Sequence, residues 1–140
     1  MTTVTFSPIL PTLAGSVLPG ASAAAFTPVG ATGDLVPISN TGMTLVIIQN
    51  SGATTPTVKF QSQPDNWGNT GTGIDYTVTV PTTTAAPNGV LVGVLQKGRF
   101  GNPGTLVTTS TGAVEQTCML TYSATTNLSI CVIHVPWASQ

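Results

Sequence analysis

Charged side chains are scarce in this sequence. Its 140 residues include three Lys and Arg and four Asp and Glu, so 5% are charged, whereas a soluble domain averages about 25%. The formal net charge is -1, and the chain has little of the charge repulsion that keeps proteins apart in solution. We therefore expect the molecule to work inside a larger assembly, with a neutral secreted domain as the alternative.

The few basic residues and the short apolar runs exclude two classes of partner. Lys59, Lys97 and Arg99 are the only cations, and they cannot form a basic patch that neutralises phosphates. Prolines and glycines interrupt the longest weakly apolar region, in residues 11–20, so no stretch has the length of a membrane span. The N-terminus lacks the positively charged region of a secretory signal, although residues 21–25 superficially resemble a cleavage site. We expect neither nucleic acid nor membrane as a partner.

Groups that could catalyse a reaction or bind a metal are also scarce. His134 is the only histidine, so one chain cannot build a metal site with two histidines or a Ser-His-Asp triad with spare partners. We expect His134 to be a half-buried strand residue on the same inward face as Val132. A glycosidase pair would require the fold to bring together carboxylates that are separated in sequence: Asp34, Asp65, Asp75 and Glu115. The sequence predicts a protein without enzymatic activity, metal or cofactor.

The C-terminal quarter of the chain predicts an antiparallel hairpin. Two β-rich runs, Thr117–Tyr122 and Leu128–Val135, flank a short polar linker. A five-residue loop places apolar residues opposite one another on one face: Tyr122 with Leu128, Leu120 with Ile130, and Cys118 with Val132. Burial favours this register, because a slip of one residue exchanges the two faces of a strand.

The hairpin also contains the two cysteines, which are too few for a disulfide scaffold. A four-residue loop would place Cys118 opposite Cys131, but it would also place Leu120 opposite Ser129. With the five-residue loop, the cysteines lie on opposite faces of the hairpin. We therefore expect buried thiols without a disulfide, as suits a protein assembled in a cytoplasm.

Residues 1–30 differ in composition from the rest of the chain. Four prolines stand among small residues, and proline at this density removes strand hydrogen-bond donors and stops helices. Apart from a possible short strand at residues 2–6, we expect an extended arm whose order depends on its partners. Its large apolar side chains are candidate partner-binding residues: Phe6, Ile9, Leu10, Leu13 and Phe26.

Residues 31–140 predict one β-rich domain. Turn residues separate short strand-forming runs at intervals of about ten residues, without a convincing helix. The predicted strands before the hairpin are Asp34–Ile38, Met43–Gln49, Thr57–Gln61, Ile74–Val80, Val90–Leu95 and Leu106–Thr109. This pattern predicts the all-β class: a single antiparallel β-sandwich or jelly-roll-like domain with an extended Pro-rich N-terminal arm.

Several runs predict details of burial. The continuous apolarity of Met43–Gln49 is typical of a central strand covered on both faces, here by the core and by the arm. In Thr57–Gln61, Val58 and Phe60 should point inward and Lys59 toward water. Alternation in Ile74–Val80 predicts one shared face for Ile74, Tyr76, Val78 and Val80. We expect Gly98–Gly104 to be a glycine-rich turn.

Trp67 stands at the centre of a long polar loop, residues 62–73. Many β-sandwich modules use a tryptophan flanked by Asp, Asn and Gly as a platform on which a sugar ring stacks. The same composition describes an ordinary long loop pinned by one buried aromatic. The loop lacks the alternating acidic residues of a calcium-binding loop. Trp67 is therefore a candidate binding residue, for a sugar or another partner.

Short motifs distributed over roughly residues 33–136 together resemble a known family. In order they are Gly33-Asp34, Asn40-Thr41-Gly42 leading into Thr44-Leu45-Val46 and Asn50, Thr77-Val78-Thr79-Val80-Pro81, Gly98-Arg99-Phe100, and Leu120-Thr121-Tyr122-Ser123 leading through Leu128 to Val135-Pro136. This order is similar to that of the small all-β virion proteins encoded near the major capsid gene in many tailed phages. Among them it resembles the head decoration, or cement, class.

The resemblance implies a non-enzymatic structural protein of the virion, made in the host cytoplasm. Such a protein binds the major capsid protein on the outer capsid surface and stabilises the capsid, often as a homotrimer. Two alternatives remain open at this point. The chain could be a β-domain of a phage tail or fibre, or a carbohydrate-binding β-sandwich module that uses Trp67.

Overall fold

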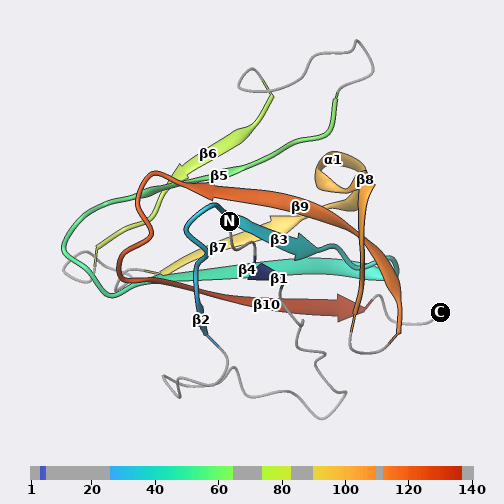
Figure 1. Ribbon diagram of the computed structural model, residues 1–140, viewed down its shortest axis with the longest axis horizontal. Helices are drawn as coiled ribbons and strands as arrows, with labels where there is room; N and C mark the ends of the chain where they lie inside the picture. Colours follow the sequence, from blue (N-terminus) through green and yellow to red (C-terminus); the bar gives the residue numbers. More distant parts are fainter. Residues whose placement is uncertain (1–3, 6–25, 65–73, 83–89, 110–111, 137–140) are drawn as a thin grey trace.

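The computed structural model describes residues 4–5, 26–64, 74–82, 90–109 and 112–136. Two β-sheets pack face to face and the core lies between them (Figure 1). The strands are antiparallel except for one short parallel pair. The predicted all-β, sandwich-like fold is therefore confirmed.

The first sheet is built around β9, whose two edges carry most of the other strands. Its strand order is β1-β3-β9-β5-β6, and β8 pairs with the beginning of β9. The parallel pair is β1 with β3. The strand bounds are β1 Val4–Thr5, β3 Asp34–Pro37, β5 Thr57–Phe60, β6 Tyr76–Thr79, β8 Asn102–Thr108 and β9 Val114–Tyr122.

The second sheet has the order β2-β10-β4-β7. Its centre is the long pairing of β4 with β10, which runs from Leu128 opposite Asn50 to Pro136 opposite Gly42. One helical turn, α1 (Lys97–Phe100), joins β7 to β8. The strand bounds are β2 Thr27–Pro28, β4 Gly42–Asn50, β7 Val90–Leu95 and β10 Leu128–Pro136.

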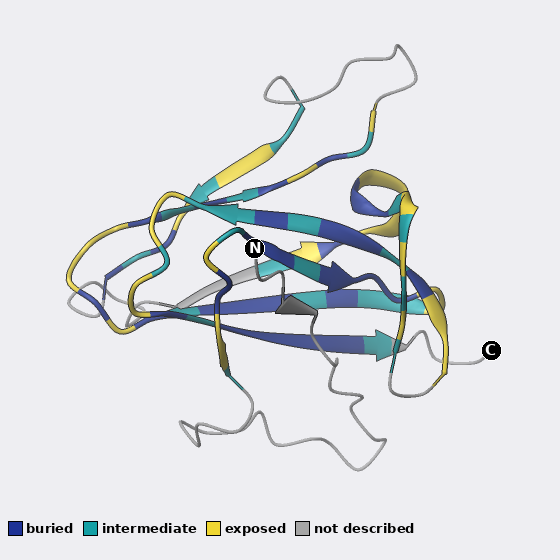
Figure 2. Ribbon diagram, in the orientation of Figure 1, coloured by how far each residue is buried: buried dark blue, intermediate teal, exposed yellow. Residues whose placement is uncertain are grey.

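Alternate residues of the facing strands form the core (Figure 2). Val58 and Phe60 point inward as predicted, while the side chain of Lys59 is 40% exposed. The central members of the core have little or no exposed area: Val36, Val46, Ile48, Val58, Leu120, Ile130 and Val132. Most of this core comes from β-branched residues and leucine, which pack well on a pleated surface.

The outer face of the second sheet is also apolar. Ile47, Cys131 and Ile133 are buried there, and Phe26 packs against them. The prediction that β4 is covered on both faces is therefore confirmed, and Phe26 supplies part of the cover. Phe26 belongs to the predicted arm, of which the structure describes only Val4–Thr5 and the residues from Phe26 onward.

The predicted hairpin is wrong. β9 lies in the first sheet and β10 in the second, so the two strands face each other across the core (Figure 1). The linker between them crosses from one sheet to the other and contains Asn127 in a left-handed conformation, with φ 65°. Neither the five-residue nor the four-residue register exists, because β10 pairs with β4 and β2 instead.

The physical reason lies in the second face of β10. In a hairpin, Cys131 and Ile133 would share a face with the threonines of β9. Pairing with β4 places Cys131 opposite Ile47 and Ile133 opposite Leu45, so apolar residues meet on both faces of the sheet. The residues predicted to point inward from β9 and β10 are in the core, but they contact one another between sheets.

One smaller prediction also needs correction, and another is confirmed. The predicted turn at Gly98–Gly104 contains α1 and the first part of β8. The shared face predicted for residues of Ile74–Val80 is confirmed, because Tyr76 lies opposite Phe60 and Val78 opposite Val58; on this face Val80 is fully buried and Tyr76 is 53% exposed. Tyr76 belongs to an edge strand, where part of one face stays uncovered.

The turn before β3 requires a glycine. Gly33 has φ 106°, and a Cβ there would collide with the carbonyl oxygen of Leu120. Residues other than glycine rarely adopt this backbone conformation. The turn is closed by Gly33 N–H, which donates to Gly30 O at 3.1 Å, and it directs Asp34 into the interior.

Candidate functional site

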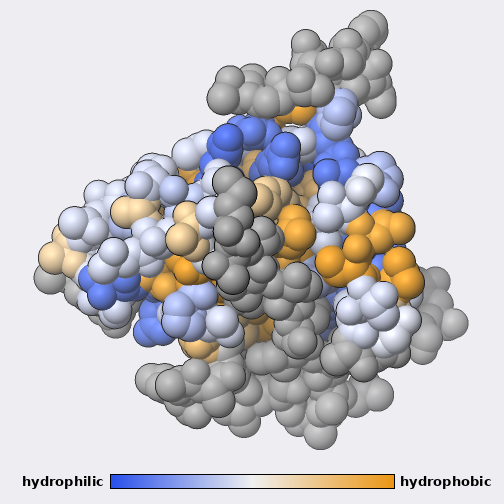
Figure 3. Space-filling view, viewed as in Figure 1, coloured by the Kyte–Doolittle hydropathy of each residue, from blue (hydrophilic) through white to orange (hydrophobic). Residues whose placement is uncertain are grey.

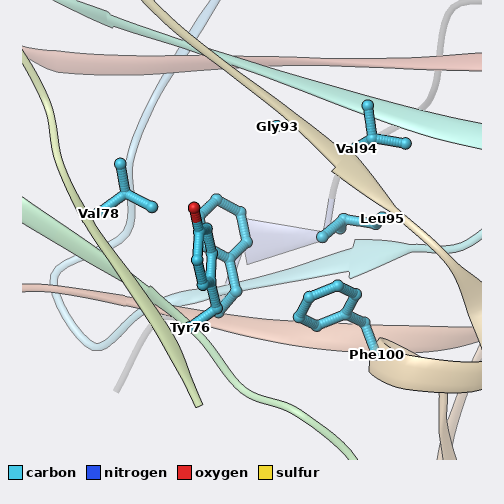
Figure 4. A pocket seen from close by; sticks show the side chains of 7 residues that line it. Tyr76, Val78, Gly93, Val94, Leu95 and Phe100 are labelled. Atoms are coloured by element: carbon cyan, nitrogen blue, oxygen red, sulfur yellow. The ribbon is translucent and has the colours of Figure 1, made fainter. Parts of the chain in front are cut away.

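An apolar pocket of about 90 Å³ opens between the two sheets beside β6 and β7. Figure 4 shows the rings of Tyr76 and Phe100 and the side chains of Val78 and Leu95 around it. Gly93 also lines the pocket, and a Cβ there would lie 3.4 Å from the Phe60 ring. The glycine therefore leaves space next to a core aromatic residue.

Aromatic contacts give the pocket its walls. Phe60 contacts Tyr76 and Phe100, with ring centroids 6.4 Å apart in each case. The Arg99 guanidinium carbon lies 5.8 Å from the Tyr76 ring centroid and 5.2 Å from that of Phe100. These distances are within the range of cation–π attraction. The site can therefore accept an apolar group, with a cation at its rim.

Four of the six charged side chains in the described part of the chain are buried or paired, whereas Lys97 and Arg99 are exposed. Lys59 Nζ lies 3.6 Å from Asp75 Oδ2, and the Asp75 side chain is 3% exposed. Lys97 Nζ donates to Asn40 Oδ1 at 2.7 Å. The described surface therefore carries few charges, and in Figure 3 most of the coloured surface is pale or orange, with deep blue in small groups.

The exposed large apolar residues lie on strands near the edges of the sheets. Tyr76 and Val94 flank the pocket, and they are 53% and 48% exposed. Leu106 on β8 and Val114 at the start of β9 are 56% and 55% exposed. These residues can contact a partner without an ion pair.

His134 and Glu115 form a buried polar pair on the β10 side of the core. Both residues are 5% exposed, and His134 Nδ1 lies 3.7 Å from Glu115 Oε2. His134 Nε2 lies 3.0 Å from the Pro37 carbonyl oxygen, to which it donates. The predicted inward strand position of His134 is correct, but the residue is buried and not half-buried. No sequence signal joins it to Glu115, because the two residues lie on different strands.

Asp34 is a second buried carboxylate. It has no exposed area, and it accepts hydrogen bonds from Tyr122 Oη at 2.7 Å and from Gly30 N at 3.0 Å. Burial raises the pKa of Asp34 above its usual 3.8, although both hydrogen bonds oppose the shift. Burial also raises the pKa of Tyr122, as does the carboxylate beside it. The two groups link the turn before β3 to the end of β9.

Most residues predicted to bind a partner lie outside the described part of the chain. These are Phe6, Ile9, Leu10, Leu13 and Trp67. Phe26 is the exception, and it packs on the outer face of the second sheet. Within the described ranges, no three His, Cys, Asp or Glu residues lie close enough to hold a metal ion, and no helix is long and apolar enough to cross a membrane.

Comparisons with protein-family models, with curated proteins and with solved structures give no match for this chain. The fold therefore defines its class as an all-β, sandwich-like domain. The candidate site comprises an apolar pocket and exposed apolar side chains near the edges of the sheets, with few charges.

Proposed function

We propose that this chain is a non-enzymatic structural protein of a phage virion, which binds the outer surface of the capsid and stabilises it. Its partners are then the major capsid protein and other copies of itself, in the homotrimer that the resemblance to head decoration proteins implies. The role requires neither a cofactor nor a metal.

The scarcity of exposed charge carries this proposal, since Lys97 and Arg99 are the only charged residues of the described part that are exposed and unpaired with an opposite charge. In the described residues, Asp34 and Glu115 are buried, and Lys59 is paired with Asp75. A protein that must remain dissolved as separate molecules normally carries many surface charges of both signs. A surface with so few of them is suited to permanent contact with an assembly, where association is the functional state.

The kind of contact available supports the same role. Exposed apolar side chains and uncharged strand edges can dock on a capsid by apolar burial and main-chain hydrogen bonds. Such contacts are screened by salt much less than ion pairs are. Binding to the capsid should therefore persist in concentrated salt.

The test is to separate DNA-filled heads from tails of a phage that carries this gene and to locate the protein. We expect many copies on each head, retained through a wash in concentrated salt. Heads from a phage lacking the gene should release their DNA at a lower temperature, and adding the purified protein back should restore the native value.

Other distributions would contradict the proposal. Recovery on purified tails would favour the tail or fibre alternative. Absence from virions, together with retention on a glycan column that a Trp67→Ala variant loses, would favour the carbohydrate-binding alternative.

A further inference from the structure

The free edge of β7 has a feature that the proposed function does not use. In the described part of the chain, β7 pairs only with β4, so its other edge has no strand beside it. β7 is a run of six residues, Val90–Leu95, without charge or proline. An unpaired edge of this kind is a template for another strand, and natural proteins usually protect such edges.

The other edge strands of this molecule do carry protection. β1 and β2 are two residues long, and β2 contains Pro28. β8 contains Pro103 and an irregular register with β9. β6 is four residues long and exposes Thr77 and Thr79. Among the described edge strands, only β7 lacks such protection. This indicates that another strand covers its edge when the protein is in its functional state.

The sequence of β7 indicates what covers it. Leu91-Val92-Gly93-Val94-Leu95 reads the same in both directions about Gly93. An antiparallel pair related by a two-fold axis at Gly93 would place Leu91 opposite Leu95 and Val92 opposite Val94. Each position then meets a residue of its own type, and glycine lies at the axis. Opposed β-branched and apolar residues are favourable cross-strand pairs.

The absence of charge matters particularly for pairing with an identical strand. A charge near the axis would face the same charge on the second copy, which destabilises a sheet. The nearest cations in sequence, Lys97 and Arg99, belong to α1, four and six positions beyond Gly93. At about 3.4 Å per residue, the two copies of Leu95, the last residue of β7, would stand roughly 14 Å apart along the strands, and the cations lie beyond it in sequence. This separation exceeds the Debye length of about 8–10 Å in ordinary buffers.

We propose that β7 is a self-association edge, which pairs antiparallel with β7 of a second copy about a two-fold axis at Gly93. The pairing joins the two second sheets into one continuous sheet and covers Val94. It also brings the second copy beside the pocket that Gly93 and Leu95 line. The contact does not depend on the capsid. One edge per chain joins copies in pairs, so in a trimeric protein it would join two trimers.

The first test compares masses by sedimentation. Val94→Lys places a charge on the exposed side of β7, where 48% of the valine is accessible, so the fold should tolerate it. Leu106→Lys is the matched control, because Leu106 is 56% exposed on another edge strand. We expect Val94→Lys to halve the mass of the native particle and Leu106→Lys to leave it unchanged. Equal masses for native protein and Val94→Lys would overturn the proposal.

The second test does not require the association to be weakened. Gly93 is the position that would face itself across the axis, so Gly93→Cys should form a disulfide-linked pair under mild oxidation. Gly98→Cys is the control, since a Cβ there meets nothing within 4 Å and should report collisions only. We expect faster cross-linking of Gly93→Cys. Equal rates for the two variants would overturn the two-fold pairing, and a native trimer insensitive to Val94→Lys would mean that the copies associate elsewhere.

Discussion

Asp34 and Glu115 are both buried carboxylates, but they differ in their hydrogen bonding. Asp34 satisfies both oxygens, because Gly30 N–H and Tyr122 Oη donate to it. Glu115 Oε2 has no hydrogen-bond partner among the described residues and depends on His134 at 3.7 Å. A buried polar atom without a hydrogen bond is costly. We therefore expect different consequences when each group is changed.

Replacing the Asp34 carboxyl should alter how stability depends on pH. Its raised pKa means that the folded state holds the proton more tightly than the unfolded state. Its contribution is therefore fully present below the ordinary value of 3.8 and is lost as pH rises through the raised pKa of the folded state. Asp34→Asn can still accept from Gly30 N–H and can donate its amide N–H to Tyr122 Oη, without a charge. Relative to this variant, the native protein should become less stable as pH rises, as denaturant unfolding across a pH series would measure.

Tyr122→Phe provides a companion variant for the same measurement. Its hydroxyl lowers the pKa of Asp34, so removing it should extend the pH-dependent loss to higher pH. Parallel pH profiles for the native protein and Asp34→Asn would show that Asp34 has the same pKa in the folded and unfolded states.

Removing His134 should be destabilising. His134→Leu would remove the hydrogen bond to the Pro37 carbonyl oxygen and the polar neighbour of Glu115 Oε2, and a buried polar group left unsatisfied typically costs about 1–3 kcal/mol. Adding Glu115→Leu should recover much of the loss, because the double variant replaces the pair with apolar groups. Denaturant unfolding of the two single variants and the double variant measures this coupling. A double variant less stable than His134→Leu would contradict the assigned pairing.

At the scale of elements, the positions of the two cysteines reflect the fact that β9 and β10 belong to different sheets. Cys118 lies in the core between the sheets, whereas Cys131 lies on the outer face of the second sheet. Both cysteines are buried and without a disulfide, which confirms the predicted thiols. Their predicted placement on two faces of one hairpin is wrong, since no hairpin forms.

Burial should make both thiols slow to react. Burial raises the pKa of Cys118 to about 12 and also raises that of Cys131, and the thiolate is the reactive form. We expect alkylation to modify neither cysteine in the native protein and both in denaturant without reductant. Leu106→Cys, at a position 56% exposed, should add one fast-reacting thiol as the control. A native cysteine that reacts as fast as this control would contradict the packing of its strand.

At the scale of the whole molecule, the N-terminal segment meets both sheets. Val4–Thr5 pairs with β3, Thr27–Pro28 pairs with β10, and Phe26 covers the outer face of the second sheet. The residues between these contacts include Ile9, Leu10 and Leu13. Burying one such side chain stabilises an ordered segment by about 1.5–3 kcal/mol. The loss of backbone conformational entropy destabilises it by about 1–2 kcal/mol per residue. The balance is close, so docking on a partner can decide it.

Deleting residues 2–25 tests this segment while keeping Phe26 and β2. We expect a folded sandwich that no longer stays on phage heads, measured as occupancy on purified heads with thermal unfolding alongside. Replacing Ile9, Leu10 and Leu13 with serine, at unchanged length, should have the same effect. Undiminished occupancy would place the capsid-binding surface on the sandwich itself, with the Trp67 loop as the next candidate.

The sequence alone determined much about individual strands. Alternation identified Val58, Phe60, Leu120 and Ile130 as inward residues, and turn residues marked most of the breaks between strands. Continuous apolarity identified β4 as a strand covered on both faces. These predictions succeed because side-chain alternation and turn conformations are properties of a few consecutive residues.

Only the tertiary structure decided which strands are partners and which polar groups meet. Local pattern favoured a β9–β10 hairpin, but β4 offers β10 apolar neighbours on both faces. The contacts of His134 with Glu115 and of Asp34 with Tyr122 follow from that arrangement. Pairing is a competition among all strands of the chain for the greatest apolar burial. Its outcome is therefore not contained in any one stretch of sequence, however clear the pattern of that stretch.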